Sequence, residues 1–191
     1  MNIIIASPHD RNSKMEEDLK NKSPYLNCAY VRTPKELISF DFEHFSPDWI
    51  FFPHWSWKVP SEVFLQYQCV IFHMTDLPFG RGGTPLQNLI LRGLRNTKIC
   101  ALKCEEGIDT GPIYCRRPLA LSGSAEEILG RAHLEIQDMI EEIVEHNPNP
   151  EPQCGDIVEF DRRTAQDGNL ESISDVYKVY DYIRMLDAKG Y

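Results

Sequence analysis

Two side chains that could exchange protons stand out in the sequence, His73 and Asp109. His73 ends the apolar run CVIFH (69–73), and Asp109 lies in the short turn-like stretch GIDTG (107–111). An aspartate beside a histidine can orient the imidazole and favour its charged form, and such a pair in a cleft can act as a general acid–base unit. A lone histidine at a strand end is more often structural, so this chemistry depends on where the fold places Asp109.

Alternating predicted strands and helices surround His73. Short apolar runs are typical of buried strands, and they occupy 3–7, 27–33, 48–53 and 69–73. Helical spacing or a proline in the first turn is typical of helices, and such stretches occupy 10–21, 33–40, 59–67 and 85–94. The alternation predicts an α/β fold, a Rossmann-like open, mostly parallel twisted sheet with helices on both faces. Ligands of such sheets bind beyond the carboxyl ends of the strands, where His73 lies.

A predicted hairpin would bring the aspartate to the histidine. Strand-like runs at 97–106 and 112–121 flank the turn that holds Asp109. If this hairpin lies beside the strand at 69–73, the Asp109 carboxylate can reach the His73 imidazole.

The rest of the chain predicts a long helix and a C-terminal extension. Ser124 and Glu127 have the spacing of a capping box, and apolar residues then recur with helical periodicity. The proline-rich stretch NPNPEPQ (147–153) marks a linker. A short strand and a final helix are predicted at 155–160 and 173–188. We expect a catalytic domain at 1–146 and an extension at 147–191 that packs on the same domain.

The composition is that of a globular protein with an excess of acidic residues. The 191 residues carry a formal net charge of −9, which weighs against nucleic acid as a partner, because phosphate backbones usually bind a basic face. No apolar run approaches the length of about 20 residues that spans a bilayer, and the N-terminal residues lack the features of a signal peptide. We expect a cytoplasmic protein with its six cysteines reduced and with no metal site or membrane partner. A homodimer is compatible with the sequence.

Two motifs, HMTDLPFGRGGTPLQNLI (73–90) and CEEGIDTGPIYCRRPLAL (104–121), resemble the N10-formyltetrahydrofolate-dependent formyltransferases. In that family a strand ends in Asn-x-His, a proline-containing turn and a glycine loop follow, and a later Gly-Leu-Asp-Thr-Gly turn supplies an aspartate. His73 and Asp109 stand at the matching places, at about the family's interval. The resemblance covers roughly 45–145 and implies a formyltransferase catalytic domain. It is greatest with sugar N-formyltransferases and with formylation domains of peptide synthetases.

The resemblance also implies which residues bind the two substrates. His73 and Asp109 match the catalytic pair, and N10-formyltetrahydrofolate is the implied formyl donor. The implied folate-binding residues are Phe52, His54, Trp55, Trp57, Glu105, Gly107, Ile108 and Asp109. The implied acceptor-binding residues, in the segment after His73, are Met74, Thr75, Asp76, Phe79, Gly80, Arg81, Gly82 and Gly83.

Several of these residues could have either a binding role or a purely structural one. The glycines at 80, 82 and 83 would let the backbone approach a ligand closely, and Arg81 could pair with a phosphate or a carboxylate. Asp76 could bind a substrate ammonium group or cap its own turn. Trp55 and Trp57 are as compatible with the core as with a wall against the folate.

One position departs from the family pattern. Ile71 stands where the family has the asparagine that helps to hold the formyl oxygen, and isoleucine has no hydrogen-bond donor to offer. Loss of such a donor typically costs about 10²–10³ in rate. An active enzyme therefore needs a replacement from HWSW (54–57), a backbone N–H or His73 itself. The alternative is a non-catalytic folate- or nucleotide-binding module, which would have no need for both His73 and Asp109.

The expected acceptor is the primary amine of a nucleotide-linked amino sugar, such as a UDP- or dTDP-4-amino-deoxysugar, for cell-surface glycan biosynthesis. The chain is acidic and shows no basic C-terminal barrel of the kind found in tRNA formyltransferases, and the purine enzymes keep the asparagine. The stretch FDRRTAQDGNL (160–170) is similar to the segment that closes the catalytic domain of sugar formyltransferases, so Tyr191 need not be the natural end. An aminoacyl group on a peptide-synthetase carrier is the alternative acceptor.

Overall fold

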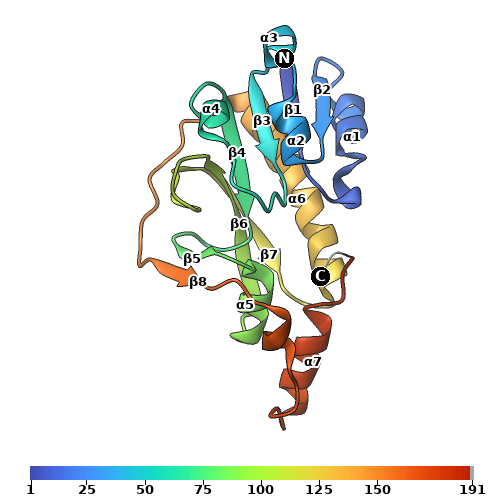
Figure 1. Cartoon of the computed structure of the whole chain (residues 1–191), viewed down its shortest axis with the longest axis vertical. Helices are drawn as coiled ribbons and strands as arrows, with labels where there is room; N and C mark the ends of the chain where they lie inside the picture. Colours follow the sequence, from blue (N-terminus) through green and yellow to red (C-terminus); the bar gives the residue numbers. More distant parts are fainter. Residues whose placement is uncertain (190–191) are drawn as a thin grey trace.

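Six strands form one mixed sheet at the centre of the computed structural model, which describes residues 1–189 (Figure 1). The strands are β1 (Asn2–Ala6), β2 (Asn27–Val31), β3 (Trp49–Phe52), β4 (Gln68–His73), β6 (Asn96–Lys103) and β7 (Ile113–Ala120). Their order is β2-β1-β3-β4-β6-β7, with the first four parallel and with β6 antiparallel to both of its neighbours. The predicted α/β fold, with a mostly parallel sheet and helices on both faces, is confirmed.

Helices cover both faces of the sheet because successive side chains of a buried strand point to opposite sides. In β1, Ile3 and Ile5 belong to one core cluster, whereas Ile4 and Ala6 belong to the other. The first cluster includes residues of α1 (Met15–Lys22), α5 (Pro85–Leu91) and α6 (Ala125–His146). The second includes residues of α2 (Pro34–Ile38) and α4 (Ser61–Phe64), with α3 (Phe42–Phe45) at its margin.

The long helix α6 begins at the predicted capping box. The Ser124 hydroxyl accepts a hydrogen bond from the Glu127 backbone N–H, and the Glu127 carboxylate accepts one from the Ser124 N–H. The buried stripe from Ile128 to Ile143 packs into the first core cluster. Asn147, at a φ of 43°, ends the helix in the left-handed conformation common at such ends. Local capping and periodicity therefore account for both its position and its length.

After α6 the chain runs along the outside of the molecule and returns to the segment that follows His73 (Figure 1). There β8 (Val158–Phe160) pairs in parallel with β5 (Phe79–Gly82) to form a second, two-stranded sheet. We predicted only a glycine loop at 79–82. It is a strand because β8, far away in the sequence, supplies its partner. The remaining short elements are η1 (Asp10–Asn12), η2 (Ala165–Gly168) and α7 (Val176–Arg184).

Two expectations bear on the ends and surfaces of the chain. Tyr191, which we expected need not be the natural end, lies outside the described residues. Within residues 1–189, none of the helices combines the length and the apolar character needed to cross a membrane.

Candidate functional site

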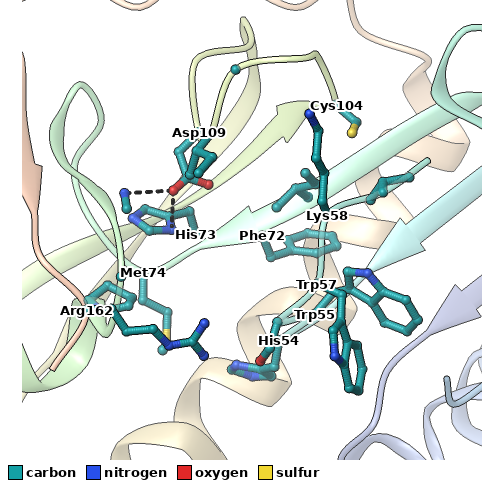
Figure 2. A pocket seen from close by; sticks show the side chains of 18 of the residues that line it. His54, Trp55, Trp57, Lys58, Phe72, His73, Met74, Cys104, Asp109 and Arg162 are labelled. Carbon is teal, nitrogen blue, oxygen red and sulfur yellow. Dashed lines mark hydrogen bonds and ion pairs between the residues drawn. The ribbon is translucent and has the colours of Figure 1, made fainter. Parts of the chain in front are cut away.

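His73 and Asp109 meet at the carboxyl end of β4 (Figure 2). β6 pairs with β4 and continues into the turn that carries Asp109, so the hairpin of β6 and β7 brings the carboxylate to the imidazole. Asp109 Oδ2 lies 3.4 Å from His73 Nδ1, and only 10% and 7% of the two side chains are exposed. Asp109 has a φ of 54°, a conformation in which aspartate is more frequent than most other residues with a side chain.

Both nitrogens of the His73 ring face oxygen atoms. The Gly80 carbonyl oxygen lies 2.7 Å from Nε2, and because a carbonyl only accepts, Nε2 is the donor. Asp109 Oδ2 faces Nδ1 and also accepts a hydrogen bond of 2.9 Å from the Gly82 N–H. A proton on either ring nitrogen therefore has an acceptor, and the two contacts fix the orientation of the imidazole.

The pair lies on the wall of a cavity of about 420 Å³. The aromatic loop 54–59, the turn 104–109 and the segment 82–85 form most of the walls. The lining residues are His9, His54, Trp55, Ser56, Trp57, Lys58, Val59, Ile71, Phe72, His73, Met74, Gly82, Gly83, Thr84, Pro85, Cys104, Glu105, Glu106, Gly107, Ile108, Asp109 and Arg162. The cavity is thus apolar and aromatic along one loop, with charged groups at several points of its wall.

The aromatic loop carries two buried donors or acceptors without a protein partner. Among the described residues, His54 Nε2 and Trp55 Nε1 are buried and form no hydrogen bond. Burial, together with the nearby His9, Arg11 and His133, lowers the pKa of His54 from 6.5 to about 3. His54 is therefore neutral near pH 7. An unpartnered buried polar atom is costly unless a ligand or water satisfies it, so these two atoms indicate where a ligand would form hydrogen bonds.

The predicted folate-binding residues lie on this cavity, with one exception. His54, Trp55, Trp57, Glu105, Gly107, Ile108 and Asp109 all line it. Phe52 is fully buried in the second core cluster and has its ring 5.5 Å from that of Trp55, so its side chain supports the loop from below. Phe52 was implied by the family resemblance, but the alternation of side chains along β3 turns its ring into the core.

Some of the predicted acceptor-binding residues line the cavity, and the others lie outside it. Met74, Gly82 and Gly83 line the cavity. Thr75 is fully buried and donates to the Gly80 oxygen at 3.3 Å, and the Phe79 ring contacts that of Phe160. The Asp76 carboxylate lies in a separate hollow, 2.9 Å from Lys98 Nζ and 3.8 Å from Arg116 Nε. Two cations, on β6 and β7, thus hold Asp76 outside the cavity that contains His73, and a role of Asp76 in binding a substrate ammonium group stays a prediction.

The glycine segment makes room for the chain itself. A Cβ atom added at Gly80 would lie 2.8 Å from the Phe160 ring, and one added at Gly82 would lie 2.7 Å from the Phe160 carbonyl oxygen. At Gly83 it would lie 2.6 Å from Arg162 Cα. The close approach that these glycines allow within the chain is thus to β8 and the residues after it, and Gly82 and Gly83 also line the cavity.

Arg81 is also engaged within the chain. Its Nε and Nη2 atoms donate to Gln153 Oε1 at 3.1 and 2.7 Å. Arg81 is not among the cavity-lining residues, and the expected phosphate or carboxylate partner is replaced by this amide. The cationic residues on the cavity wall are instead Lys58 and Arg162, both exposed.

Several lining residues were not predicted. Arg162 points into the cavity in Figure 2, although it belongs to the C-terminal segment after β8. His9 and Thr84 belong to other loops, and Cys104 has its pKa raised to about 12 by burial, so its thiol stays protonated. Lys58, Thr84 and Cys104 are each next to a predicted site residue in the sequence. Nothing in the spacing of His9 and Arg162 indicates that the fold brings them to the cavity.

Ile71 lies on the cavity wall, on the same strand as His73. Residues two apart on a strand share a face, so the isoleucine side chain occupies the place from which the family's asparagine would act. The departure noted in the sequence is thus located in the site itself.

Comparison with known proteins places this site in context. A family model described as "Methionyl-tRNA formyltransferase, C-terminal domain" matches residues 165–191. The solved structure of a methionyl-tRNA formyltransferase from Clostridium thermocellum is 47% identical, with a TM-score of 0.96, and the match covers 100% of this chain and 85% of that one. A methionyl-tRNA formyltransferase of Rickettsia felis is 30% identical over 119 residues, 60% of this chain and 39% of the relative.

A more distant structure shares the fold. A sugar N-formyltransferase from Shewanella sp. FDAARGOS_354 superposes with a TM-score of 0.72 at 17% identity, over 100% of this chain and 90% of that one. The chain covers 31% and 39% of the first two curated relatives, about a third of their length.

Proposed function

The chain belongs to the formyltransferase family, and on that premise we propose that it transfers a formyl group from N10-formyltetrahydrofolate to a primary amine. Members of the family use this folate as formyl donor. The observation that carries the proposal is the buried His73–Asp109 contact of 3.4 Å on the wall of a cavity of about 420 Å³. A module that only binds has no use for this pair.

The cavity residues fit a folate. Trp57, at 45% exposure, and Ile108, at 72%, offer apolar surface at the rim, where the ring systems of the ligand would lie. The unpartnered His54 Nε2 and Trp55 Nε1 are available for hydrogen bonds with it. When bound, the folate supplies the formyl group, which passes from its N10 atom to the nitrogen of the amine.

His73 handles the proton in this proposal. The attacking amine must lose a proton and N10 must gain one, and an imidazole at the reacting centre can serve both transfers, which contributes about 10²–10⁴ in rate. Asp109 holds the ring through Nδ1, and the Gly80 oxygen holds Nε2. The substrate would compete with one of these oxygens for the imidazole proton. His54 Nε2 and Trp55 Nε1 are the candidates to replace the donor that Ile71 lacks, since neither has a partner among the described residues.

The acceptor that the comparisons favour is the amine of methionyl-tRNA. The relatives at 47% and 30% identity carry that name, and so does the family model that matches residues 165–191. The names weaken our expectation that nucleic acid is not a partner. Lys58 and Arg162 provide positive charge on the cavity wall of an otherwise acidic chain, which suits the phosphates near the end of a tRNA.

A nucleotide-linked amino sugar is the second candidate acceptor. The net charge of −9 favours a small substrate with few phosphates over a polyanion. A sugar N-formyltransferase also shares the fold of this chain, at 17% identity. The same two cations would suit a nucleoside diphosphate. An aminoacyl group on a peptide-synthetase carrier has no observation in its favour.

The test measures tetrahydrofolate release from N10-formyltetrahydrofolate with methionyl-tRNA, and separately with a set of nucleotide-linked amino sugars. We expect formyl transfer to one class of acceptor, and we expect its rate to fall about 10²–10⁴-fold in His73→Ala. An exposed histidine of α3 gives the matched control, His44→Ala, which should keep full activity. Folate binding without transfer to any of these amines would refute the proposal.

A further inference from the structure

Gln153 joins the two segments that hold the catalytic histidine. Its side-chain Nε2 donates to the backbone oxygens of Asp109 and Gly111, both at 2.8 Å. Its Oε1 accepts the two hydrogen bonds from Arg81. All the hydrogen-bonding positions of this amide are thus used, and the orientation is unambiguous, because the guanidinium only donates and the carbonyls only accept.

The partners of Gln153 are next to, or identical with, the partners of His73. Arg81 lies between Gly80, whose oxygen accepts from Nε2, and Gly82, whose N–H donates to Asp109 Oδ2. Asp109, which faces Nδ1, is itself held through its backbone by Gln153. The Gln153 side chain therefore links the two segments that place Gly80 O and Asp109 Oδ2 at the ring nitrogens of His73.

The backbone around Gln153 is itself anchored. Two residues earlier, Glu151 exchanges backbone hydrogen bonds of 2.7 and 2.9 Å with Ile113 at the start of β7. Pro152, with its restricted φ, precedes Gln153, and both Pro152 and Cys154 are exposed. Gln153 is thus a partly buried residue in the segment 151–160. This segment is hydrogen-bonded to β7 at Glu151 and to β5 through β8.

From this geometry we propose that Gln153 is a positioning residue, which keeps Asp109 and Gly80 at the correct separation on the two nitrogens of His73. The proposal rests on the proposed formyl transfer for its effect on rate, but the arrangement of the ring can be tested without activity. A displacement of about 1 Å in a catalytic group can cost up to 10² in rate. We expect Gln153→Ala to lower kcat by about 10- to 100-fold, with little change in the KM for N10-formyltetrahydrofolate.

Two variants test the hydrogen bonds of Gln153. Gln153→Ala removes those with Arg81 as well as those with the Asp109 and Gly111 oxygens. Gln153→Glu keeps an acceptor for Arg81 but turns a carboxylate oxygen toward the carbonyls of Asp109 and Gly111, so it should also lose kcat. Gln166→Ala, which changes an exposed glutamine of η2, is the matched control and should behave as the wild type.

The second readout is the NMR signals of the His73 ring nitrogens in 15N-labelled protein at fixed pH, assigned with His73→Ala. We expect them to shift in both Gln153 variants and to stay unchanged in Gln166→Ala. If the wild type transfers no formyl group, these signals alone decide the question. Unchanged ring signals in both Gln153 variants would overturn the proposal, whatever the activity, and so would wild-type kcat in both. If Gln153→Ala does not fold, Gln153→Glu carries the same test.

Discussion

His54 is a partly buried titratable group whose protonation the folded protein resists. Burial, with the nearby His9, Arg11 and His133, brings its pKa from 6.5 to about 3. Because the pKa in the folded state lies below that in the unfolded state, the unfolded chain binds more protons in acid. The stability that neutral His54 contributes is therefore fully present above pH 6.5 and is lost progressively as the pH falls toward 3.

The perturbation is His54→Asn. Asparagine does not titrate and accepts the left-handed conformation of this position, which has a φ of 54°. At 1.36 kcal/mol per pKa unit, linkage gives a loss of about 2 kcal/mol from His54 between pH 7 and pH 5. The free energy of unfolding of the wild type should therefore fall by about 2 kcal/mol more than that of the variant over this interval.

The assay is urea unfolding followed by tryptophan fluorescence at several pH values between 5 and 7. The contribution of His9, whose pKa is also lowered by burial, is largely common to both proteins and cancels in the comparison. His44→Asn changes an exposed histidine and should follow the wild type at every pH. Parallel pH curves for the wild type and His54→Asn would show that the reasoning about this partly buried ring is wrong.

Four further predictions concern the fold and its thiols. Ser124→Ala removes the capping box of α6 and should lower the free energy of unfolding in urea by about 1 kcal/mol. A Cβ at Gly130 meets nothing within 4 Å, so Gly130→Ala should raise that free energy by about 0.5–1 kcal/mol. Gly83→Ala should lower it by about 1–3 kcal/mol, since the new Cβ meets the Arg162 backbone at 2.6 Å. Cys154 is exposed, so peptide mapping after brief alkylation should find it labelled first; earlier labelling of a buried cysteine would contradict the structure.

The features predicted correctly from sequence depend on neighbouring residues. The buried strand at 3–7 and the start of α6 each follow from a run of a few residues, an apolar stretch in one case and a capping box in the other. The meeting of His73 and Asp109 needed one further step, the pairing of a hairpin with the strand before it. Such contacts between consecutive elements are the kind that sequence reasoning reaches.

The features that were missed depend on residues far apart in the chain. FGRG (79–82) has no alternation of apolar residues, and it becomes a strand only because β8 pairs with it. Arg81 has the chemistry of an anion-binding residue, but its partner is an amide in a stretch that resembled a plain linker. Arg162 likewise reaches the cavity from the stretch between the predicted strand at 155–160 and the predicted final helix. No local pattern encodes which distant segment will lie beside another.

The order of these segments along the chain determines when the site can form during synthesis. His73 and Asp109 leave the ribosome well before Gln153 and β8, which lie beyond α6. A nascent chain that ends at α6 already contains both catalytic candidates, yet Arg81 still lacks its amide and β5 its partner strand. The candidate site therefore has its full set of contacts only once the chain through β8 has been synthesised.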